Sequence, residues 1–392
     1  MFRKRIYLDY ASLTPIDSRV LYEIKRFSAQ KYANPSSWYR EGVAAKKALD
    51  ESRKSVADFL HAHPDEIIFT SGGTETNCLA IEGVIKSTKA AGIEKPHLII
   101  SAIEHSSIME VASKMEKWGC EVTKIGVDKN GTILLDQLKK SIKPNTVLIS
   151  IMTVNNEIGT IQPIREIAKI IRHAKGGYDR VRVAKRTSQY NLYPLFHTDA
   201  AQGALYNELH VEKLGIDLLT LDGSKVYGPR GIGALFIKRN TSIEPIIFGG
   251  GQEFGMRSGT ENLPSIAGFA KALEIITIEN GKGKMENVST LRNHMITGLN
   301  KISPGVRVNG FSPHILNVSI PGIDNEFFVL QLDENGIACS TKSSCLRDQE
   351  ESYVLKAIGA PNGESIRFSF GRWTEKKDIR RVLKIIAKIM TI

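Results

Sequence analysis

Short apolar stretches alternate with longer amphipathic ones through most of the chain, and this regularity leaves few folds open. Apolar runs of about five residues between turns predict buried strands, and apolar residues at helical spacing predict helices. The predicted strands lie at 66–70, 97–101, 121–125, 147–152, 195–198, 217–221 and 234–237. Helices are predicted near 18–30, 44–60, 76–90, 106–118, 135–142 and 161–174. The alternation predicts an α/β fold, a doubly wound domain built on a mostly parallel sheet.

The chain is long enough for two domains. Its 392 residues exceed the roughly 250–300 residues beyond which one hydrophobic core stops growing. We expect a large domain over 16–262 and a smaller α/β domain made of 1–15 and 263–392. The smaller domain is predicted to have strands at 306–309, 315–319 and 365–370 and helices at 264–300, 325–335 and 374–390. The polar segment 339–352 is expected to be a loop.

Composition places the chain among ordinary globular proteins. Hydrophobic residues make up 42% and charged residues 24% of the sequence, which are average values. No apolar run approaches the roughly 20 residues that span a bilayer, and the basic N-terminus lacks the apolar core of a signal peptide. We therefore expect a cytoplasmic protein without membrane contact. The net charge of +11 is spread along the chain, so we do not expect direct binding of nucleic acid from it.

The cysteines do not indicate a disulfide framework or a metal site. Cys78, Cys120, Cys339 and Cys345 form no C-x-x-C pair and have no zinc-ligand spacing with histidines. Cys78 and Cys120 lie in apolar contexts, which are typical of buried, unreactive thiols.

A basic segment that contains tyrosines, 175–194, is unusual for its length. A connection from a helix to a strand usually takes about 2–6 residues. The segment fits a solvated hairpin, and it also fits an arm that binds a partner.

Polar residues gather where predicted strands end. These clusters lie at 71–74, 104–105, 155–157, 199–202 and 222–225. Open α/β sheets bind their ligands outside the carboxyl ends of the strands. We therefore expect one site at this edge of the sheet.

Lys225 follows strand 217–221 and a turn made of Asp222, Gly223 and Ser224. A lysine held against apolar walls can lose its proton below the free pKa of about 10.4 and form an imine with a carbonyl group. The same position suits a solvated lysine or one that binds phosphate. The motif by itself does not decide between them.

A second feature is a turn that can bind an anion. Strand 66–70 runs into Gly72, Gly73 and Thr74 before a helix, and small residues at a helix N-terminus let backbone N–H groups approach an anion. A helix start capped by Thr74 fits this segment equally well. An imine-forming lysine, an anion cradle and Asp199 at a strand end together match the needs of pyridoxal 5'-phosphate.

A series of short motifs extends this pattern over nearly the whole chain. They are Tyr7-Leu-Asp-Tyr, Asn34-Pro-Ser-Ser, Phe69-Thr-Ser-Gly-Gly-Thr-Glu, Glu104-His, Val154-Asn-Asn-Glu-Ile-Gly, His197-Thr-Asp-Ala-Ala-Gln, Lys225-Val-Tyr-Gly-Pro, Arg257-Ser-Gly-Thr and Ser365-Ile-Arg-Phe-Ser. By these motifs the chain resembles the cysteine desulfurases, in the class V aminotransferase group of fold type I pyridoxal-phosphate enzymes. The resemblance implies a homodimer whose smaller domain carries the catalytic-cysteine loop.

The resemblance also implies roles around the cofactor. Lys225 would bind the cofactor aldehyde and later move the substrate α-proton, while Asp199 would pair with the ring nitrogen. His105 would stack on the ring. The alternative interpretation is that His105 is only a polar residue at the start of a helix. Gln202 and Asn156 would contact the ring oxygen and the face of the cofactor.

Further residues would hold the phosphate and the substrate. The phosphate would be bound by Gly73, Thr74 and Ser224, joined by Thr260 of the partner subunit. Asn34 and Arg367 would bind the substrate, and the planar guanidinium of Arg367 suits its carboxylate.

Cys345 matches the family's nucleophilic cysteine. The resemblance implies that L-cysteine is converted to L-alanine and leaves a persulfide on Cys345. The sulfur would pass to an acceptor protein, an iron–sulfur cluster scaffold or a tRNA-thiolation protein. Two alternatives remain open: a related lyase or aminotransferase for another amino acid, and a catalytically weakened homologue that acts as a binding or scaffold protein.

Three residues depart from the family's pattern. Asp222 stands where a phosphate-binding serine is usual, and a carboxylate beside a phosphate is repulsive unless it turns away, for example toward a backbone N–H. Lys342 replaces a glycine before Cys345, so it should stiffen the loop and could lower the thiol pKa. The third departure is Tyr39, which stands where a histidine is common. Separately, Cys339 falls where an apolar residue usually enters the loop, and it is expected to be structural.

Overall fold

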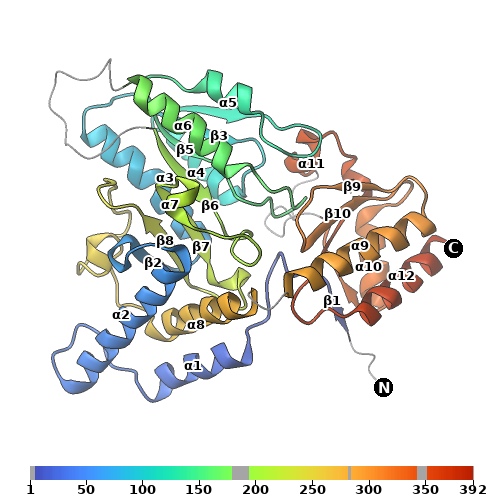
Figure 1. Cartoon of the computed structure of the whole chain (residues 1–392), viewed down its shortest axis with the longest axis horizontal. Helices are drawn as coiled ribbons and strands as arrows, with labels where there is room; N and C mark the ends of the chain where they lie inside the picture. Colours follow the sequence, from blue (N-terminus) through green and yellow to red (C-terminus); the bar gives the residue numbers. More distant parts are fainter. Residues whose placement is uncertain (1–4, 179–193, 281–283, 342–350, 392) are drawn as a thin grey trace.

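The computed structural model describes residues 5–178, 194–280, 284–341 and 351–391. Lys342 and Cys345 lie outside these ranges, and so does most of the basic segment 175–194. Helix α6 (Ile164–Tyr178) continues into the start of that segment. Figure 1 shows a larger body with a central sheet beside a smaller one, and both chain ends lie at the smaller body.

Within the described residues, a seven-stranded sheet forms the centre of the large domain. In spatial order its strands are β2 (Ile67–Thr70), β8 (Gly233–Ile237), β7 (Leu218–Asp222), β6 (Leu195–Asp199), β5 (Thr146–Ser150), β3 (His97–Ser101) and β4 (Glu121–Ile125). The pairs from β7 to β4 are parallel, whereas β8 is antiparallel to both of its neighbours. The predicted α/β fold with a mostly parallel sheet is confirmed.

Helices cover both faces of this sheet. Successive strand residues enter different cores: Ile67 and Phe69 pack on one side and Ile68 on the other. The first side is covered by α1 (Ser18–Ala29), α2 (Arg40–Leu60), α5 (Leu135–Ser141), α6, α7 (Val211–Leu214) and α8 (Leu263–Asn280). The second side is covered by α3 (Gly73–Ala90) and α4 (Ser106–Lys117). Strands buried on both faces need near-continuous apolar sequences, which explains the apolar runs.

Helix α8 departs from the expected domain boundary. Its residues Leu263, Phe269 and Leu273 are buried in the core of the large domain, where α8 packs along α1 and α2. A separate helix, α9 (Lys284–Ile302), places Leu291 in the core of the small domain. The helix expected over 264–300 is therefore two helices, and residue 263 does not begin the small domain. Because α8 is apolar around most of its circumference, its pattern could not indicate which core it joins.

The small domain contains two sheets within the described residues. Strands β9 (Arg307–Asn309), β10 (Ile315–Ser319) and β12 (Ser365–Ser369) form an antiparallel sheet, and β1 (Ile6–Tyr7) pairs in parallel with β11 (Ile337–Ala338). Helices α9, α10 (Asn325–Glu334) and α12 (Lys376–Met390) contribute to its core. Ile6 and Leu8 from the N-terminal segment are buried in the same core.

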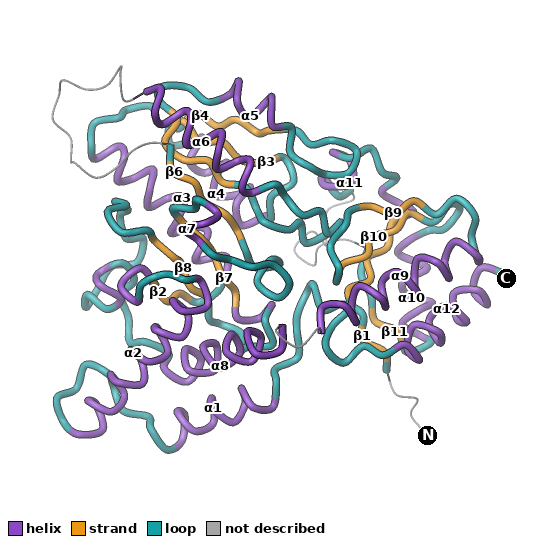
Figure 2. Tube along the Cα trace, viewed as in Figure 1, coloured by secondary structure: helices purple, strands orange, loops and turns teal. Residues whose placement is uncertain are grey.

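A short helix, α11 (Tyr353–Ala357), connects the two domains and was not predicted, because five residues are too few to show a helical period. Its Val354 and Leu355 pack with Ile103 and Ile158 of the large domain. Figure 2 shows that connecting loops of the large domain face the small domain. Among the helices of the described ranges, none is long and apolar enough to cross a membrane.

Candidate active site

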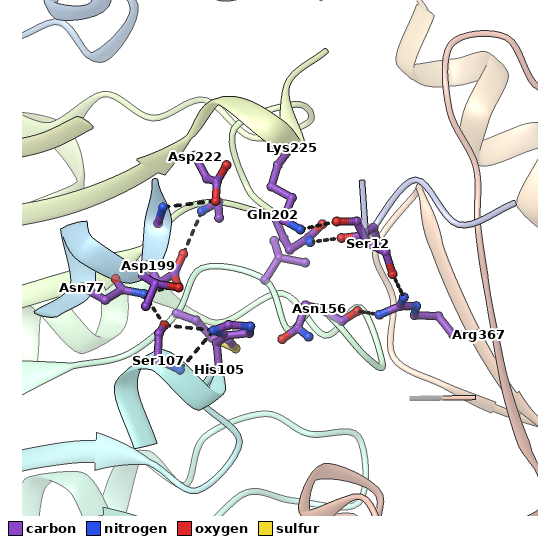
Figure 3. A pocket seen from close by; sticks show the side chains of 16 residues that line it. Ser12, Asn77, His105, Ser107, Asn156, Asp199, Gln202, Asp222, Lys225 and Arg367 are labelled. Atoms are coloured by element: carbon purple, nitrogen blue, oxygen red, sulfur yellow. Dashed lines mark hydrogen bonds between the residues drawn. The ribbon is translucent and has the colours of Figure 1, made fainter. Parts of the chain in front are cut away.

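A pocket lies at the carboxyl ends of the large-domain strands and is closed on one side by the small domain (Figure 3). It is lined by Ala11, Ser12, Gly73, Thr74, Asn77, His105, Ser107, Met152, Val154, Asn156, Asp199, Ala201, Gln202, Asp222, Lys225 and Arg367. The predicted site residues among them are Gly73, Thr74, His105, Asn156, Asp199, Gln202, Lys225 and Arg367. The predicted polar clusters thus lie together in one pocket at this edge of the sheet.

The sheet topology explains why these distant segments meet. Strands β5, β6 and β7 are parallel, so Asp199 and Asp222 end their strands at the same edge. Strand β2 is reached from β7 through two antiparallel pairings, and it therefore also ends at this edge. This places Gly73, the first residue of α3, beside Asp222.

Asp199 is a buried carboxylate with two fixed donors. It is 7% exposed. Its Oδ2 accepts a hydrogen bond from Asn77 Nδ2 at 2.8 Å, and its Oδ1 accepts one from the backbone N–H of Ala201 at 2.9 Å. These donors orient the carboxylate and stabilise its charge, so it can pair with a protonated ring nitrogen.

His105 caps helix α4, and Ser107 fixes its ring. The backbone N–H of Ser107 donates to Nδ1 at 3.2 Å, and Ser107 Oγ lies 2.9 Å from the same nitrogen. Asn77 Nδ2 donates to Ser107 Oγ at 2.9 Å, which directs the hydroxyl proton toward His105. Nδ1 is therefore an acceptor, and a neutral ring carries its proton on Nε2. His105 is thus both a helix-start residue and part of the pocket.

Lys225 and Arg367 both contact Ser12. Lys225 Nζ donates to the backbone oxygen of Ser12. Arg367 Nη2 donates to Ser12 Oγ at 2.6 Å and to Asp9 Oδ1 at 2.7 Å, and its Nη1 donates to the backbone oxygen of Asn156 at 2.8 Å. The Arg367 side chain is 2% exposed. These bonds hold a buried cation from β12 at the wall of a large-domain pocket.

Glu104 is a buried acid whose pKa is affected by the charge of Asp199. It is 1% exposed, and its Oε1 accepts a hydrogen bond from the backbone N–H of Met152 at 3.0 Å. Burial raises the pKa of Glu104 well above its ordinary value, and the negative charge of Asp199 acts in the same direction. Burial therefore favours the uncharged form of Glu104.

Asp222 turns toward backbone N–H groups. Its Oδ1 accepts a hydrogen bond from the N–H of Ser224 at 2.8 Å, and its Oδ2 accepts one from the N–H of Gly73 at 3.1 Å. Figure 3 shows Asp222 at the pocket, and the N–H of Gly73 whose hydrogen bond it accepts belongs to the N-terminus of α3. The carboxylate thus lies in the cradle that the sequence assigns to an anion.

Both ends of the segment that carries Cys345 are fixed near the pocket. On one side, the backbone of Ser340 pairs with that of Arg367. On the other side, Ser352 Oγ donates to Glu157 Oε2 at 2.7 Å, and the Tyr353 hydroxyl donates to the backbone oxygen of Glu104 at 2.5 Å. Cys345 itself is outside the described residues.

The other cysteines are in apolar surroundings. Burial raises the pKa of the Cys78 and Cys339 thiols and raises that of Cys120 to about 11. The prediction of unreactive thiols agrees with these shifts. The described part of the chain contains no group of three or more His, Cys, Asp or Glu residues placed to hold a metal ion.

Three predicted site residues do not line the pocket. Asn34 is exposed, and its Oδ1 accepts a hydrogen bond from the N–H of Ser36 at 2.9 Å. Thr260 is exposed on a surface loop, and its predicted role requires a second subunit. Ser224 contributes its backbone N–H to Asp222 instead of lining the pocket.

Sequence reasoning missed Asp9, Ser12, Asn77 and Ser107. Asp9 belongs to a motif that was found but given no role, and Asn77 is a buried polar residue on a largely apolar helix, which was a usable signal. Ser12 and Ser107 gave no signal, because their partners Arg367 and Asn77 lie 355 and 30 residues away in the sequence.

Comparison with known proteins agrees with this geometry. The sequence profile of the aminotransferase class-V family matches residues 6–382. A cysteine desulfurase IscS of Dictyoglomus turgidum is 39% identical over 397 aligned residues, which cover 99% of this chain and 95% of that protein. A mitochondrial cysteine desulfurase of Candida albicans is 40% identical over 394 residues, which cover 97% of this chain and 76% of that protein.

A solved structure agrees as well. A NifS-like protein superimposes with a TM-score of 0.87 at 31% identity, and the match covers 99% of both chains. Profile, relatives and fold match over nearly the full length, and the pocket holds the motif residues in one place. The chain therefore belongs to the aminotransferase class-V family and, within it, to the cysteine desulfurases.

Proposed function

We propose that this protein is a pyridoxal-phosphate-dependent cysteine desulfurase, which converts L-cysteine to L-alanine and supplies sulfur from a persulfide on Cys345. The observation that carries the proposal is the convergence of Lys225, Asp199, His105 and Arg367 in one pocket. The names of the relatives support the reaction and the substrate.

The pocket fits pyridoxal phosphate at the ring and aldehyde ends. Asp199 offers a buried, oriented carboxylate for the ring nitrogen, and Lys225 offers an amine for the aldehyde. Gly73 and Thr74 start helix α3, where backbone N–H groups suit a phosphate. When bound, the cofactor withdraws electrons from the substrate α-carbon. At the phosphate end, Asp222 already contacts Gly73.

The chain's own groups have distinct roles in the proposed reaction. Arg367 binds the substrate carboxylate, and Lys225 Nζ holds the cofactor and moves the proton at the substrate α-carbon. His105 covers the cofactor ring, and Gln202 and Asn156 contact its oxygen and face. Gln202 is oriented for this by the bond from its Nε2 to the backbone oxygen of Ala11 at 2.8 Å.

Cys345 supplies the nucleophile. Its thiolate attacks the substrate sulfur, the S–S bond forms, and the Cβ–S bond breaks. The carbon keeps the electron pair and takes up a proton, which yields L-alanine. Cys345 is four residues after Thr341, and an extended chain spans about 3.3–3.6 Å per residue, or about 13 Å in total. Ser340 is paired with Arg367, which lines the pocket. A reach of this length from Thr341 supports access of Cys345 to the pocket.

Assembly and partners are further parts of the proposal. Thr260 is close in sequence to two exposed aromatic residues, Phe248 and Phe254, which are 75% and 60% exposed. Exposed aromatic residues are typical of interfaces, which supports a homodimer in which Thr260 reaches the phosphate of the partner site. We propose that Asn34 binds substrate in that dimer. The sulfur acceptor would be an iron–sulfur scaffold or a tRNA-thiolation protein in the cytoplasm.

A second candidate function is a scaffold protein without turnover, and the contact of Asp222 with Gly73 favours it, because it competes with the phosphate. Incubation of the cofactor-loaded protein with L-cysteine and dithiothreitol separates the two candidates. A desulfurase releases alanine and sulfide in equal amounts. A folded dimer that releases neither product supports the scaffold, and turnover of another amino acid instead would identify a related lyase or aminotransferase.

Two variants assign the chemistry. Lys225→Ala should lose the visible absorbance of the bound cofactor and all activity, whereas Lys238→Ala, an exposed lysine at the end of β8, should keep both. Cys345→Ser should still change its spectrum with L-cysteine but release no sulfide. Sulfide release by Cys345→Ser would exclude Cys345 as the nucleophile.

A further inference from the structure

We infer that the carboxylate of Asp222 is an internal anion in the phosphate cradle, so that the phosphate of the cofactor binds only when this carboxylate gives up the N–H of Gly73. The inference rests on the proposed function, because it concerns the same pocket. Asp222 thereby controls the affinity of the pocket for the phosphate group.

The carboxylate joins two segments that meet at the pocket. Asp222 ends β7 and lies just before the turn Gly223–Lys225. One oxygen accepts a bond from Ser224 N–H at 2.8 Å within that turn, and the other accepts one from Gly73 N–H at 3.1 Å across the pocket. Figure 3 shows Asp222 and Lys225 in the same pocket.

Helix α3 explains why an anion belongs here. Its N-cap residue, Gly72, makes no side-chain cap bond. The first four N–H groups of a helix have no acceptor within the helix, and its dipole favours a negative charge at this end. Asp222 therefore supplies from β7 the cap that α3 lacks in its own sequence. The same N–H groups are the donors that a phosphate would use.

The carboxylate also takes space that a phosphate would need. A Cβ atom on Gly73 would lie 3.0 Å from Asp222 Oδ2, so the carboxylate rests against the open side of this glycine. A phosphate that approaches Gly73 N–H meets the same volume and a like charge. Arg257 is already paired with Glu75, in the first turn of α3, at 2.9 Å.

Displacement of the carboxylate requires little rearrangement. The two oxygens bind different donors, so Oδ2 can leave Gly73 while Oδ1 keeps the N–H of Ser224. A rotation of one side chain then opens the cradle, and the backbone of β7 and α3 stays in place.

The test is titration of the cofactor-free protein with pyridoxal phosphate and, separately, with pyridoxal, which lacks the phosphate. Asp222→Asn and Asp222→Ser remove the charge. Asp128→Ser is the control, because it removes an equal charge from a turn outside the pocket, where Asp128 Oδ1 accepts bonds from Asn130 and Thr132 at 2.8 and 2.9 Å. Removal of one like charge should tighten binding of pyridoxal phosphate about tenfold in both Asp222 variants.

Affinity for pyridoxal should stay within about twofold in every variant, and Asp128→Ser should match the native protein with both ligands. The inference is overturned if the Asp222 variants bind pyridoxal phosphate no more tightly than the native protein, or if pyridoxal gains as much as pyridoxal phosphate. Either result makes Asp222 a supporting residue of the cradle.

A second measurement needs neither the cofactor nor the reaction. Inorganic phosphate should raise the thermal unfolding midpoint of cofactor-free Asp222→Ser more than that of the native protein, since at equal concentration a ligand of the folded state stabilises it more when it binds more tightly. Equal shifts would overturn the inference. If no variant turned over L-cysteine but phosphate still distinguished them, the proposed function would fail while the role of Asp222 would hold.

Discussion

Arg367 combines a full charge with nearly complete burial, and its bonds leave little freedom for replacement. Its guanidinium is shared among Asp9, Ser12 and the backbone of Asn156. Removing a buried charge from its partners is costly. A planar fork can serve these acceptors and a substrate carboxylate together, whereas an ammonium group cannot.

Arg367→Lys should therefore raise KM for L-cysteine about tenfold or more, since a bond to a charged group is worth about 1.5–3 kcal/mol. Steady-state kinetics with separate KM and kcat values check this. Arg307→Lys is the control, because Arg307 bonds backbone oxygens of Gly359 and Ile358 away from the pocket. An unchanged KM with a reduced kcat would show that Arg367 does not bind the substrate carboxylate.

Helix α3 connects the two ends of the pocket. Its first residue, Gly73, contacts Asp222, and one turn later Asn77 contacts Asp199 and Ser107. Both amide hydrogens of Asn77 are thus used, one on the carboxylate and one on the hydroxyl that orients His105. The helix therefore positions both the carboxylate and the imidazole of the site.

Asn77→Ala should weaken binding of pyridoxal phosphate about tenfold or more, because Asp199 loses a buried donor worth about 1.5–3 kcal/mol. Absorbance titration of the cofactor-free protein measures the change. Asn145→Ala removes a comparable amide that bonds the backbone oxygen of Lys95 at 2.9 Å, and it should have no effect. Equal affinities for both variants would mean that the N–H of Ala201 alone holds Asp199.

A buried ion pair joins helix α2 to the turn at Glu253, which also bonds strand β2. Arg53 and Glu253 form two bonds of 2.7 Å, and their side chains are 5% and 2% exposed. Glu253 Oε2 also accepts the N–H of Phe69 at 2.8 Å. Glu253 has a positive φ of 51°, so these bonds hold a strained residue in the loop that leads to Thr260.

Arg53→Ala should lower the free energy of unfolding by about 3–5 kcal/mol, because it leaves a buried carboxylate without its cation. Arg239→Ala is the matched control: Arg239 also binds Asp65 through two bonds, but both side chains are 52% exposed, so its loss of stability should be far smaller than that of Arg53→Ala. Urea unfolding compares them. Similar losses for both variants would contradict the special role of the buried pair.

The sequence predicted the bounds of helices and strands more accurately than the contacts between distant residues. Strands such as β3 and β10 were predicted with their observed bounds, because residues that alternate between two buried faces produce an apolar run with sharp ends. The contact of Asn77 with Asp199 joins residues 122 positions apart, and no local pattern encodes such a pair. The repulsion of like charges predicted that Asp222 would turn away from the phosphate cradle, whereas the structure turns its carboxylate into the cradle, toward the N–H of Gly73.

The two domains each bury a neutral histidine. In the large-domain sheet, His197 Nδ1 lies 2.8 Å from Ser150 Oγ and its Nε2 lies 3.0 Å from Thr220 Oγ1. At the domain contact, His314 stacks on Tyr206 with ring centroids 4.3 Å apart. Burial lowers the pKa of both histidines to about 3. Both rings therefore stay uncharged in the folded protein over the ordinary pH range.

These histidines should make the whole molecule less stable in mild acid. In the unfolded chain a histidine has a pKa of about 6.5, so between pH 6.5 and 3 the unfolded state binds more protons than the folded state. The free energy of unfolding is therefore unaffected above pH 6.5 and falls as the pH drops below it. The loss is about 1.4 kcal/mol per pH unit for each histidine, or about 2 kcal/mol for each at pH 5.

His314→Asn tests this at the domain contact, where His314 Nδ1 lies 2.7 Å from Ser312 Oγ. An asparagine can keep that bond but does not titrate. The variant should lose stability at pH 7 through the smaller side chain, yet its free energy of unfolding should fall about 2 kcal/mol less than that of the native protein between pH 7 and pH 5. His173→Asn, an exposed histidine on α6, should follow the native curve. Urea unfolding at each pH gives the slopes, and parallel curves for His314→Asn and the native protein would show that His314 takes up its proton without unfolding.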